Sequence, residues 1–240
     1  MNERWFISPA WNKPITIVVE GWGDVALISA LEYNKPRADV LAIHQFKDTS
    51  KEGSPPATIE EWLTQYERNL PMRKGACIGI IVDADDDAMR TREKYQKVIN
   101  QWLKILKLDE NIVSDQRVPH VRLLSLPTEY KAGALENLLL ETTNPDFTEI
   151  RLAAEMFLQQ INNPWNKAAN SRQRWEDKVR VAALIAGSKK PMTSLANILD
   201  PRRKRPGQKK GLSVFDLEHE EFTQVKEFLD ELYDTVGTGL

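Results

Sequence analysis

The chain has 240 residues, a formal net charge of −2, 41% hydrophobic residues and 28% charged residues. These values are typical of a soluble globular protein and exclude a disordered chain with a large charge excess. No segment reaches the roughly 18 to 20 apolar residues that a membrane span needs, and no apolar signal peptide opens the sequence, so we expect a cytoplasmic protein without a membrane partner.

A strand, a tight turn and a helix are predicted at the start of the chain. Residues 15–19 form a β-branched apolar run that ends at Glu20, as expected of a strand. The segment DVALISAL, which follows Gly-Trp-Gly, has apolar residues at helical spacing. Asp24 occupies the position where we expect the N-cap of this helix, because its side chain can accept a hydrogen bond from a backbone N–H. A second strand is predicted around 39–46.

The middle of the chain repeats this alternation of strand and helix. A helix is predicted over 58–70, with Thr58 as its cap. The continuous apolar run 76–82 is typical of a strand that is covered on both faces, and the acidic segment DADDD follows it directly. A long helix is predicted from about residue 86 to residue 106. The strand over 76–82 is therefore expected to end in carboxylates, as the first one does.

The later part of the chain completes an α/β pattern and then becomes mainly helical. A strand over 121–126 and a short helix after Gly133 extend the alternation, which predicts a mostly parallel sheet with helices on both faces. Further helices are predicted over 147–161, 171–186 and 219–233. We therefore predict an α/β core of residues 1–143 and a mainly helical C-terminal extension of residues 144–240, which could pack on the core as one domain.

Acidic side chains follow two of the predicted strands at their carboxyl ends. Glu20 follows the first strand and Asp83 follows 76–82, and ligands of open parallel sheets bind beyond these ends. Asp83 and Asp85 are two residues apart, so an extended backbone would direct both to one side, and Asp87 approaches if the chain turns into its helix there. Carboxylates about 4 Å apart repel each other by about 4 kcal/mol at an effective dielectric of roughly 20.

A hard divalent cation would compensate this repulsion. Magnesium binds oxygen ligands and combines one or two carboxylates with water and substrate phosphate. The single cysteine and the three scattered histidines match no zinc-binding spacing, which argues against a transition-metal site. The alternative is that the acids cap helices and face water.

Together, the two acidic segments resemble the motifs of the Toprim domain. VVEGWGDVALISAL resembles the first motif, in which an apolar strand ends in Glu-Gly and is followed by Asp and a helix. GIIVDADDD resembles the second motif, an apolar strand that ends in Asp-x-Asp. The resemblance covers roughly residues 14 to 141 and implies a Toprim-like, Rossmann-like α/β fold. It is greatest to small stand-alone Toprim proteins and to the Toprim part of the overcoming-lysogenization-defect (OLD) nucleases.

This resemblance implies a role for each acidic residue of the site. Glu20 would be a metal ligand or the general acid/base, and Asp83 and Asp85 would be metal ligands; these three are the expected catalytic residues. Asp87 and Glu136 would complete a second metal position. Glu136 is included because GALENLLLE resembles a later Leu-Glu helix of the OLD nucleases. The implied cofactor is Mg²⁺, for which Mn²⁺ could substitute.

Basic residues would position the phosphate backbone of the substrate. The loop 201–210, PRRKRPGQKK, places six basic residues among prolines and a glycine, and Arg forks match phosphate oxygens. The candidates in this loop are Arg202, Arg203, Lys204 and Arg205. Lys178 resembles a basic position that follows the core in these relatives and would neutralise a phosphate. A solvated loop and an ordinary surface lysine are the alternatives.

The function implied by the resemblance is that of a metal-dependent nuclease or nicking enzyme, with DNA favoured over RNA, as the effector of a bacterial defence system. The chain contains no GxxxxGK[ST] loop, so an ATPase, if one is needed, would be a separate partner. A homodimer is also compatible with the sequence. Topoisomerase and primase activities are not expected, because no region resembles their strand-passage or zinc segments. Two alternatives stay open: phosphotransfer or hydrolysis on a small nucleotide, and a non-catalytic metal- or partner-binding module.

Overall fold

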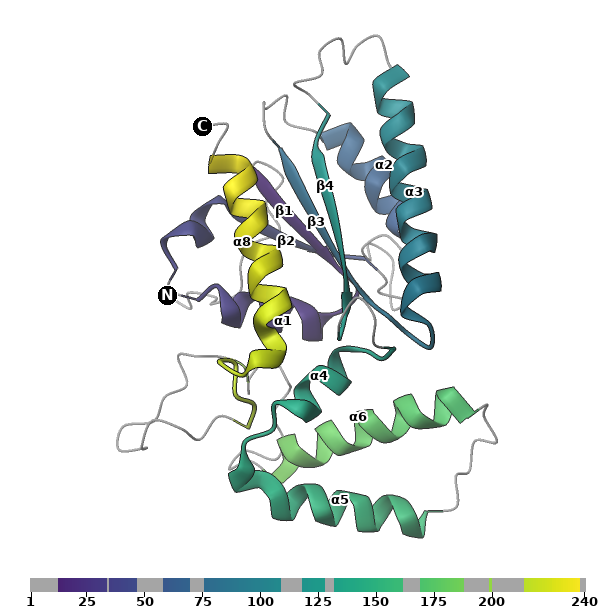
Figure 1. Ribbon diagram of the computed structural model, residues 1–240, viewed down its shortest axis with the longest axis vertical. Coiled ribbons are helices and arrows are strands. Elements are labelled where there is room, and N and C mark those ends of the chain that lie inside the picture. The colour runs from purple at the N-terminus through teal and green to yellow at the C-terminus, as the bar shows by residue number, and fades with distance from the viewer. Residues whose placement is uncertain are drawn as a thin grey trace.

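The fold is built on a parallel sheet of four strands, seen in a computed structural model (Figure 1). The structure describes residues 13–33, 35–46, 58–69, 76–108, 118–127, 132–161, 169–187, 199 and 214–237. The strands are β1 (Ile15–Val19), β2 (Leu41–Gln45), β3 (Cys77–Asp83) and β4 (His120–Leu126). They are all parallel, in the order β2-β1-β3-β4. The predicted α/β class with a mostly parallel sheet is confirmed.

Helices cover both faces of the sheet, because the strands are apolar on both sides. One face packs against α1 (Trp22–Leu31) and α8 (Thr223–Gly237), and α4 (Leu135–Glu141) joins the same apolar cluster beyond the ends of the strands (Figure 1). The other face packs against α2 (Ile59–Asn69) and α3 (Ala88–Leu108). Side chains alternate along each strand, so Ile17 of β1 lies in the first of these cores and Val18 in the second.

Two further helices lie beside α4, on the side toward which the strands run (Figure 1). They are α5 (Thr148–Gln160) and α6 (Ala169–Gly187). The guanidinium of Arg180 on α6 donates to both carboxylate oxygens of Glu155 on α5, at 2.7 and 3.0 Å. Asn137 of α4 donates to Oδ2 of the buried Asp177 on α6, at 2.9 Å. These contacts fix α6 next to the carboxyl ends of the strands.

The C-terminal helix α8 returns to the sheet and packs on β3. A Cβ atom at Gly79 of β3 would lie 2.6 Å from Cδ1 of Leu232 and 3.0 Å from the ring of Phe228. Glycine is thus required for this close approach of helix and strand. The predicted division into 1–143 and 144–240 stays a prediction, although α8 contributes side chains to the core of the sheet.

Most predicted elements are found, with shifted boundaries. The predicted strand around 39–46 begins only at Leu41, because Pro36–Val40 form a turn of 3-10 helix. Thr58 caps α2 as predicted, since its Oγ1 accepts from the N–H of Glu61 at 3.2 Å. Asp24 is not the N-cap of α1, because that helix begins at Trp22. In the described parts of the chain, no helix is long and apolar enough to span a membrane.

Candidate active site

The carboxyl ends of β1 and β3 form a topological switch point. The helix after β1 lies on one face of the sheet and leads to β2, whereas the helix after β2 lies on the opposite face and leads to β3 on the other side of β1. Connections therefore diverge between β1 and β3, and open α/β sheets bind ligands at such points. Glu20 directly follows β1 and Asp83 ends β3. The two predicted acids thus flank the place where a ligand is expected.

Glu20 and Asp83 each accept a hydrogen bond from a different helix. Glu20 is 7% exposed, and the hydroxyl of Tyr95 on α3 donates to its Oε1 at 3.1 Å. Burial and the charge of Glu20 both raise the pKa of Tyr95, so this phenol stays protonated as a donor. Asp83 is half-buried, and its Oδ1 accepts from the N–H of Leu135 at the start of α4, at 3.1 Å. These two bonds orient the two carboxylates.

Asp24 is a further carboxylate at this site, to which the sequence suggested only a capping role. It is 7% exposed, and its Oδ2 accepts from the N–H of Gly21 at 2.9 Å. Its Oδ1 is buried and has no hydrogen-bond partner within the described ranges. Burial, followed by the charge of Asp83, raises the pKa of Asp24 well above its usual range. In the sequence, Asp24 follows Glu20 by four residues across a tight turn, and this spacing could have placed Asp24 at the site.

The electrostatics show that these carboxylates gather around Asp83. Burial and the charges of Glu20 and Glu136 raise the pKa of Asp83 to about 7, against the opposing hydrogen bond from Leu135. Asp85 contributes a smaller repulsion of the same sign. We refer to Glu20, Asp24, Asp83, Asp85 and Glu136 as the acidic cluster. Repulsion between carboxylates thus contributes to the raised pKa values of Asp83 and Asp24, and a bound cation would reduce it.

Asp85 does not have the extended backbone that the sequence suggested. Its φ of +57° lies in the left-handed region, which Asp tolerates better than most residues. Its backbone exchanges two hydrogen bonds with Gly133, at 2.8 and 2.7 Å. These bonds tie the loop after β3 to the segment before α4, so the side chains of Asp83 and Asp85 take different partners.

The partner of Asp85 is Arg174 on α6, a residue that the sequence did not indicate. Nη1 of Arg174 lies 2.9 Å from Oδ1 of Asp85, and Nη2 lies 3.0 Å from Oδ1 of Asp86. Lys178, one helical turn later, lies 3.9 Å from Oε1 of Glu136. The predicted Lys178 is thus at the edge of the acidic cluster, and the four-residue spacing from Lys178 to Arg174 was the signal for the second cation.

The remaining predicted residues fall outside the centre of the site or outside the described ranges. Asp87 is exposed, and its Oδ1 accepts from the N–H of Arg90 at 3.0 Å, so it caps α3. Its position agrees with the alternative in which the acids of this segment cap a helix and face water. The role of Asp87 as a metal ligand stays a prediction. The loop 201–210, with Arg202, Arg203, Lys204 and Arg205, lies outside the described residues.

The oxygen donors of the acidic cluster fit magnesium better than a metal that needs a complete protein cage. Within the described ranges, no three carboxylate, imidazole or thiol groups stand together as a ready coordination shell. Glu20 and Asp83 are instead turned toward Tyr95 and the N–H of Leu135. Magnesium keeps several waters and takes few protein carboxylates. The buried Oδ1 of Asp24 could serve as one metal ligand, because it has no hydrogen-bond partner in the described chain.

Comparisons with known proteins identify the family but not the activity. Residues 14–234 match the family model described as "Protein of unknown function (DUF3226)", and the chain belongs to that family. No curated protein and no solved structure matches the chain. The matched range includes all residues of the acidic cluster, the basic pair on α6 and most of α8.

Proposed function

We propose that this protein is a magnesium-dependent hydrolase that cleaves phosphodiester bonds in nucleic acid. The observation that carries the proposal is the gathering of the acidic cluster at the switch point between β1 and β3, with the pKa of Asp83 raised to about 7. Carboxylates that repel one another at a ligand-binding edge are arranged for a function and not for stability. The resemblance of Glu20, Asp83 and Asp85 to the Toprim motifs is separate support.

Within this proposal, Asp83 and Asp24 supply oxygen ligands at the centre, and Glu20 acts as ligand or as general acid/base. Bound magnesium would lower the pKa of a water and balance negative charge on the leaving oxygen. The hydroxyl of Tyr95 holds Glu20 in one orientation from α3. The N–H of Leu135 does the same for Asp83. The chain therefore orients two carboxylates before any substrate arrives, which favours catalysis.

Arg174 and Lys178 would hold the phosphate of the substrate. Both project from α6 toward carboxylates of the site, so cationic groups lie on one side of the acidic cluster. The guanidinium of Arg174 bridges Asp85 and Asp86 through two nitrogens, the geometry with which Arg also binds phosphate oxygens. If Asp85 were a ligand of a bound cation, its pairing with Arg174 would weaken and this fork would be available to an incoming phosphate. Arg174 thus joins Lys178 as a proposed phosphate-binding residue.

The proposal is tested by incubating the protein with supercoiled plasmid, single-stranded DNA and RNA, in Mg²⁺, in Mn²⁺ and with chelator. We expect cleavage of at least one polynucleotide, dependent on the metal. Glu20→Gln and Asp83→Asn should each slow it by about a hundredfold or more. Glu227→Gln, on the exposed surface of α8, is the matched control and should cleave like wild type. Each variant's thermal melting confirms that it is folded.

Absence of metal-dependent cleavage of all three polynucleotides would contradict the proposal. Nucleoside triphosphates are tested as a fourth substrate. If only they are hydrolysed, the substrate of this site is a small nucleotide and not a polynucleotide. Equal rates for Asp83→Asn and wild type would show that any cleavage arises elsewhere in the molecule.

A further inference from the structure

The long helix α3 concentrates positive charge that its packing does not require. Its 21 residues include six basic residues and one acidic residue, Glu93, in a chain whose formal net charge is −2. Its inner face carries Tyr95, Ile99, Trp102 and Leu106, which are buried against the sheet. None of the described basic side chains of α3 is buried in this face, although Nζ of Lys94 lies 4.9 Å from the ring centroid of Tyr95, so most of the charge of α3 is not a by-product of forming the core.

The outer face of α3 forms a shallow groove of about 600 Å³. Its basic and amide side chains recur at helical spacing; they are Arg92, Gln96, Lys97, Asn100, Gln101 and Lys104. Lysine and arginine with asparagine and glutamine are among the side chains that most often contact phosphate and sugar. Apart from Met89 and Glu93, the described lining therefore consists of side chains that can contact a nucleic-acid backbone.

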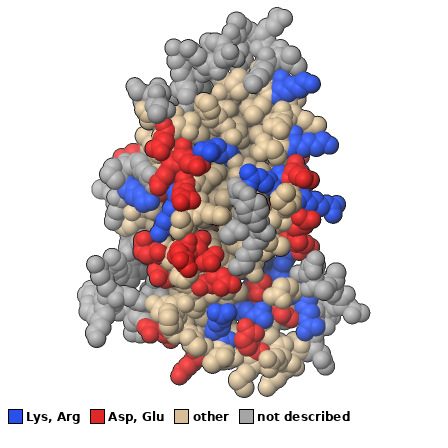
Figure 2. Space-filling model, in the orientation of Figure 1, with Lys and Arg blue, Asp and Glu red and all other residues tan. Residues whose placement is uncertain are grey.

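Two cations of this face, Lys97 and Lys104, are available for a ligand. Lys97 and Lys104 are exposed and have no ion-pair partner among the residues that the structure describes. Glu93 is the only carboxylate among the described residues that line the groove. In Figure 2, Lys and Arg side chains project along the edge of the molecule that α3 forms, with acidic atoms toward its lower end.

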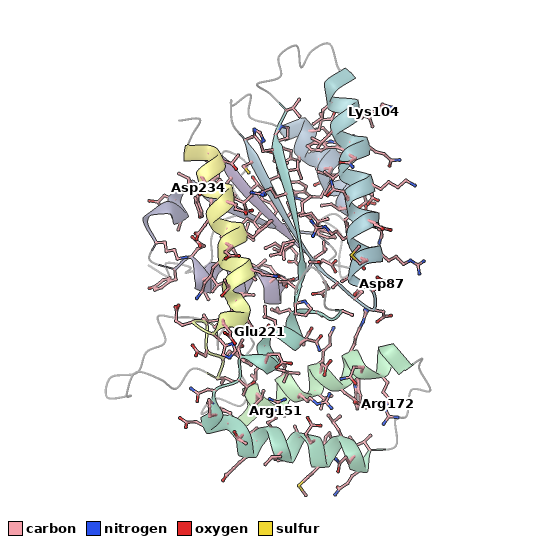
Figure 3. The ribbon with its side chains drawn as sticks, in the orientation of Figure 1. Asp87, Lys104, Arg151, Arg172, Glu221 and Asp234 are labelled. Carbon is pink, nitrogen blue, oxygen red and sulfur yellow. The ribbon has the colours of Figure 1, made fainter. Side chains whose placement is uncertain are left out.

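The groove leads to the acidic cluster. Asp87 and Lys104 lie near the two ends of α3 (Figure 3), and Asp87 follows Asp85 by two residues. From Met89 to Lys104 the helix rises by about 22 Å, which corresponds to about six base pairs of duplex. A backbone that lies along this face would therefore reach the carboxyl ends of β1 and β3.

We propose that the outer face of α3 binds the sugar–phosphate backbone of the nucleic acid and leads it to the acidic cluster. Naming nucleic acid as the occupant rests on the proposed function. The charge of the face, its amide side chains and its course toward the cluster are independent of that function. Binding is insensitive to sequence, because phosphates carry the contacts.

The test compares two double variants that remove the same charge. Lys97→Gln with Lys104→Gln removes two cations from the groove. Arg122→Gln with Lys226→Gln removes two cations from outside the groove, where each pairs with an exposed carboxylate. Binding of a fluorescent DNA duplex, single strand and RNA of the same sequence is measured by anisotropy, with chelator present so that no cleavage occurs.

We expect the α3 variant to bind about tenfold more weakly on every sequence, with the slope of log K against log salt reduced by about 2. The control pair should keep the wild-type slope. Among the duplex, the single strand and the RNA, the one for which the α3 variant changes the salt slope most is identified as the ligand of this face. Equal slopes for wild type and the α3 variant, or no binding of any nucleic acid by wild type, would overturn the inference.

A small diester separates this inference from the proposed function. Hydrolysis of bis(4-nitrophenyl) phosphate needs the acidic cluster but cannot extend along α3. If the α3 variant hydrolyses it like wild type yet loses cleavage of DNA, both inferences hold. If wild type binds DNA through α3 but hydrolyses no diester, the inference stands and the proposed function fails.

Discussion

Asp83 is the residue on which the site depends. It ends the central strand β3, it receives a hydrogen bond from the first turn of α4, and it is repelled by Glu20 and Glu136. The negative neighbours raise the free energy of charged Asp83, so this arrangement does not stabilise the fold when Asp83 is deprotonated. Its raised pKa is therefore best understood as a property that a bound cation would reverse, since metal binding requires the deprotonated form.

Asp83 should make the stability of the metal-free protein depend on pH. Its folded-state pKa of about 7 lies above the ordinary Asp value of 3.8, so the folded state binds the proton more tightly than the unfolded state. The stabilisation is complete below about pH 4 and is lost as the pH rises through about 7. Asp83→Asn removes this dependence while Asn still accepts from Leu135. At pH 8 it should melt about 3 °C or more above wild type.

Melting curves from pH 5 to pH 8 in chelator check this prediction. The difference between the variant and wild type should grow as the pH rises. A variant that melts below wild type at pH 8 would show that the charged carboxylate stabilises the fold, contrary to the repulsion between Asp83 and its neighbours.

Asp85 shows a second property of single residues at this site. A non-glycine residue with positive φ is uncommon, and such strained positions are concentrated at functional sites. Here the turn directs Asp85 toward Arg174 and Asp83 toward α4. One strained residue thus divides two neighbouring carboxylates between two helices.

At the scale of elements, α6 and α8 connect the C-terminal segment to the sheet in different ways. Helix α6 brings Arg174 and Lys178 to the acidic cluster through its contacts with α4. Helix α8 lies directly on β3, where Gly79 leaves room for Leu232. Because α8 forms a layer of the core, the sheet without it would expose a large apolar face.

Gly79→Ala should therefore destabilise the protein. Its added Cβ would approach the fully buried Leu232 to 2.6 Å, and overpacking of this kind costs about 1–3 kcal/mol. Gly237→Ala at the end of α8 is the matched control, because nothing lies within 4 Å of a Cβ added there. Urea unfolding measures both free energies. A Gly79→Ala variant as stable as wild type would show that α8 can move away from β3 at no cost.

At the scale of the whole molecule, local patterns predict the elements better than the site. The apolar runs before Glu20 and Asp83 predict β1 and β3, and continuous apolar strands need helices on both faces. The acids themselves were predictable, since parallel strands bring their carboxyl ends to one edge. Tyr95 and Arg174 were not, because their contacts join segments 75 and 88 residues apart.

The same limit explains the errors at Asp24 and Asp85. A helix start can be read from sequence within a few residues only, and α1 begins two residues before Asp24. An extended backbone was assumed for Asp83 and Asp85, which would direct both side chains to one side. Instead, Asp85 has a positive φ, and its backbone forms two hydrogen bonds with Gly133. Tertiary contacts decided both positions.

The central claim is that the acidic cluster binds magnesium, and calorimetric titration of the metal-free protein with Mg²⁺ tests it most directly. We predict saturable binding that releases protons near pH 7, because Asp83 must lose its proton. The folded state should gain about 2.7 kcal/mol at a hundredfold excess over Kd. Asp83→Asn, although folded, should bind far more weakly and release fewer protons. No binding by wild type, or equal binding by wild type and Asp83→Asn, would contradict the account.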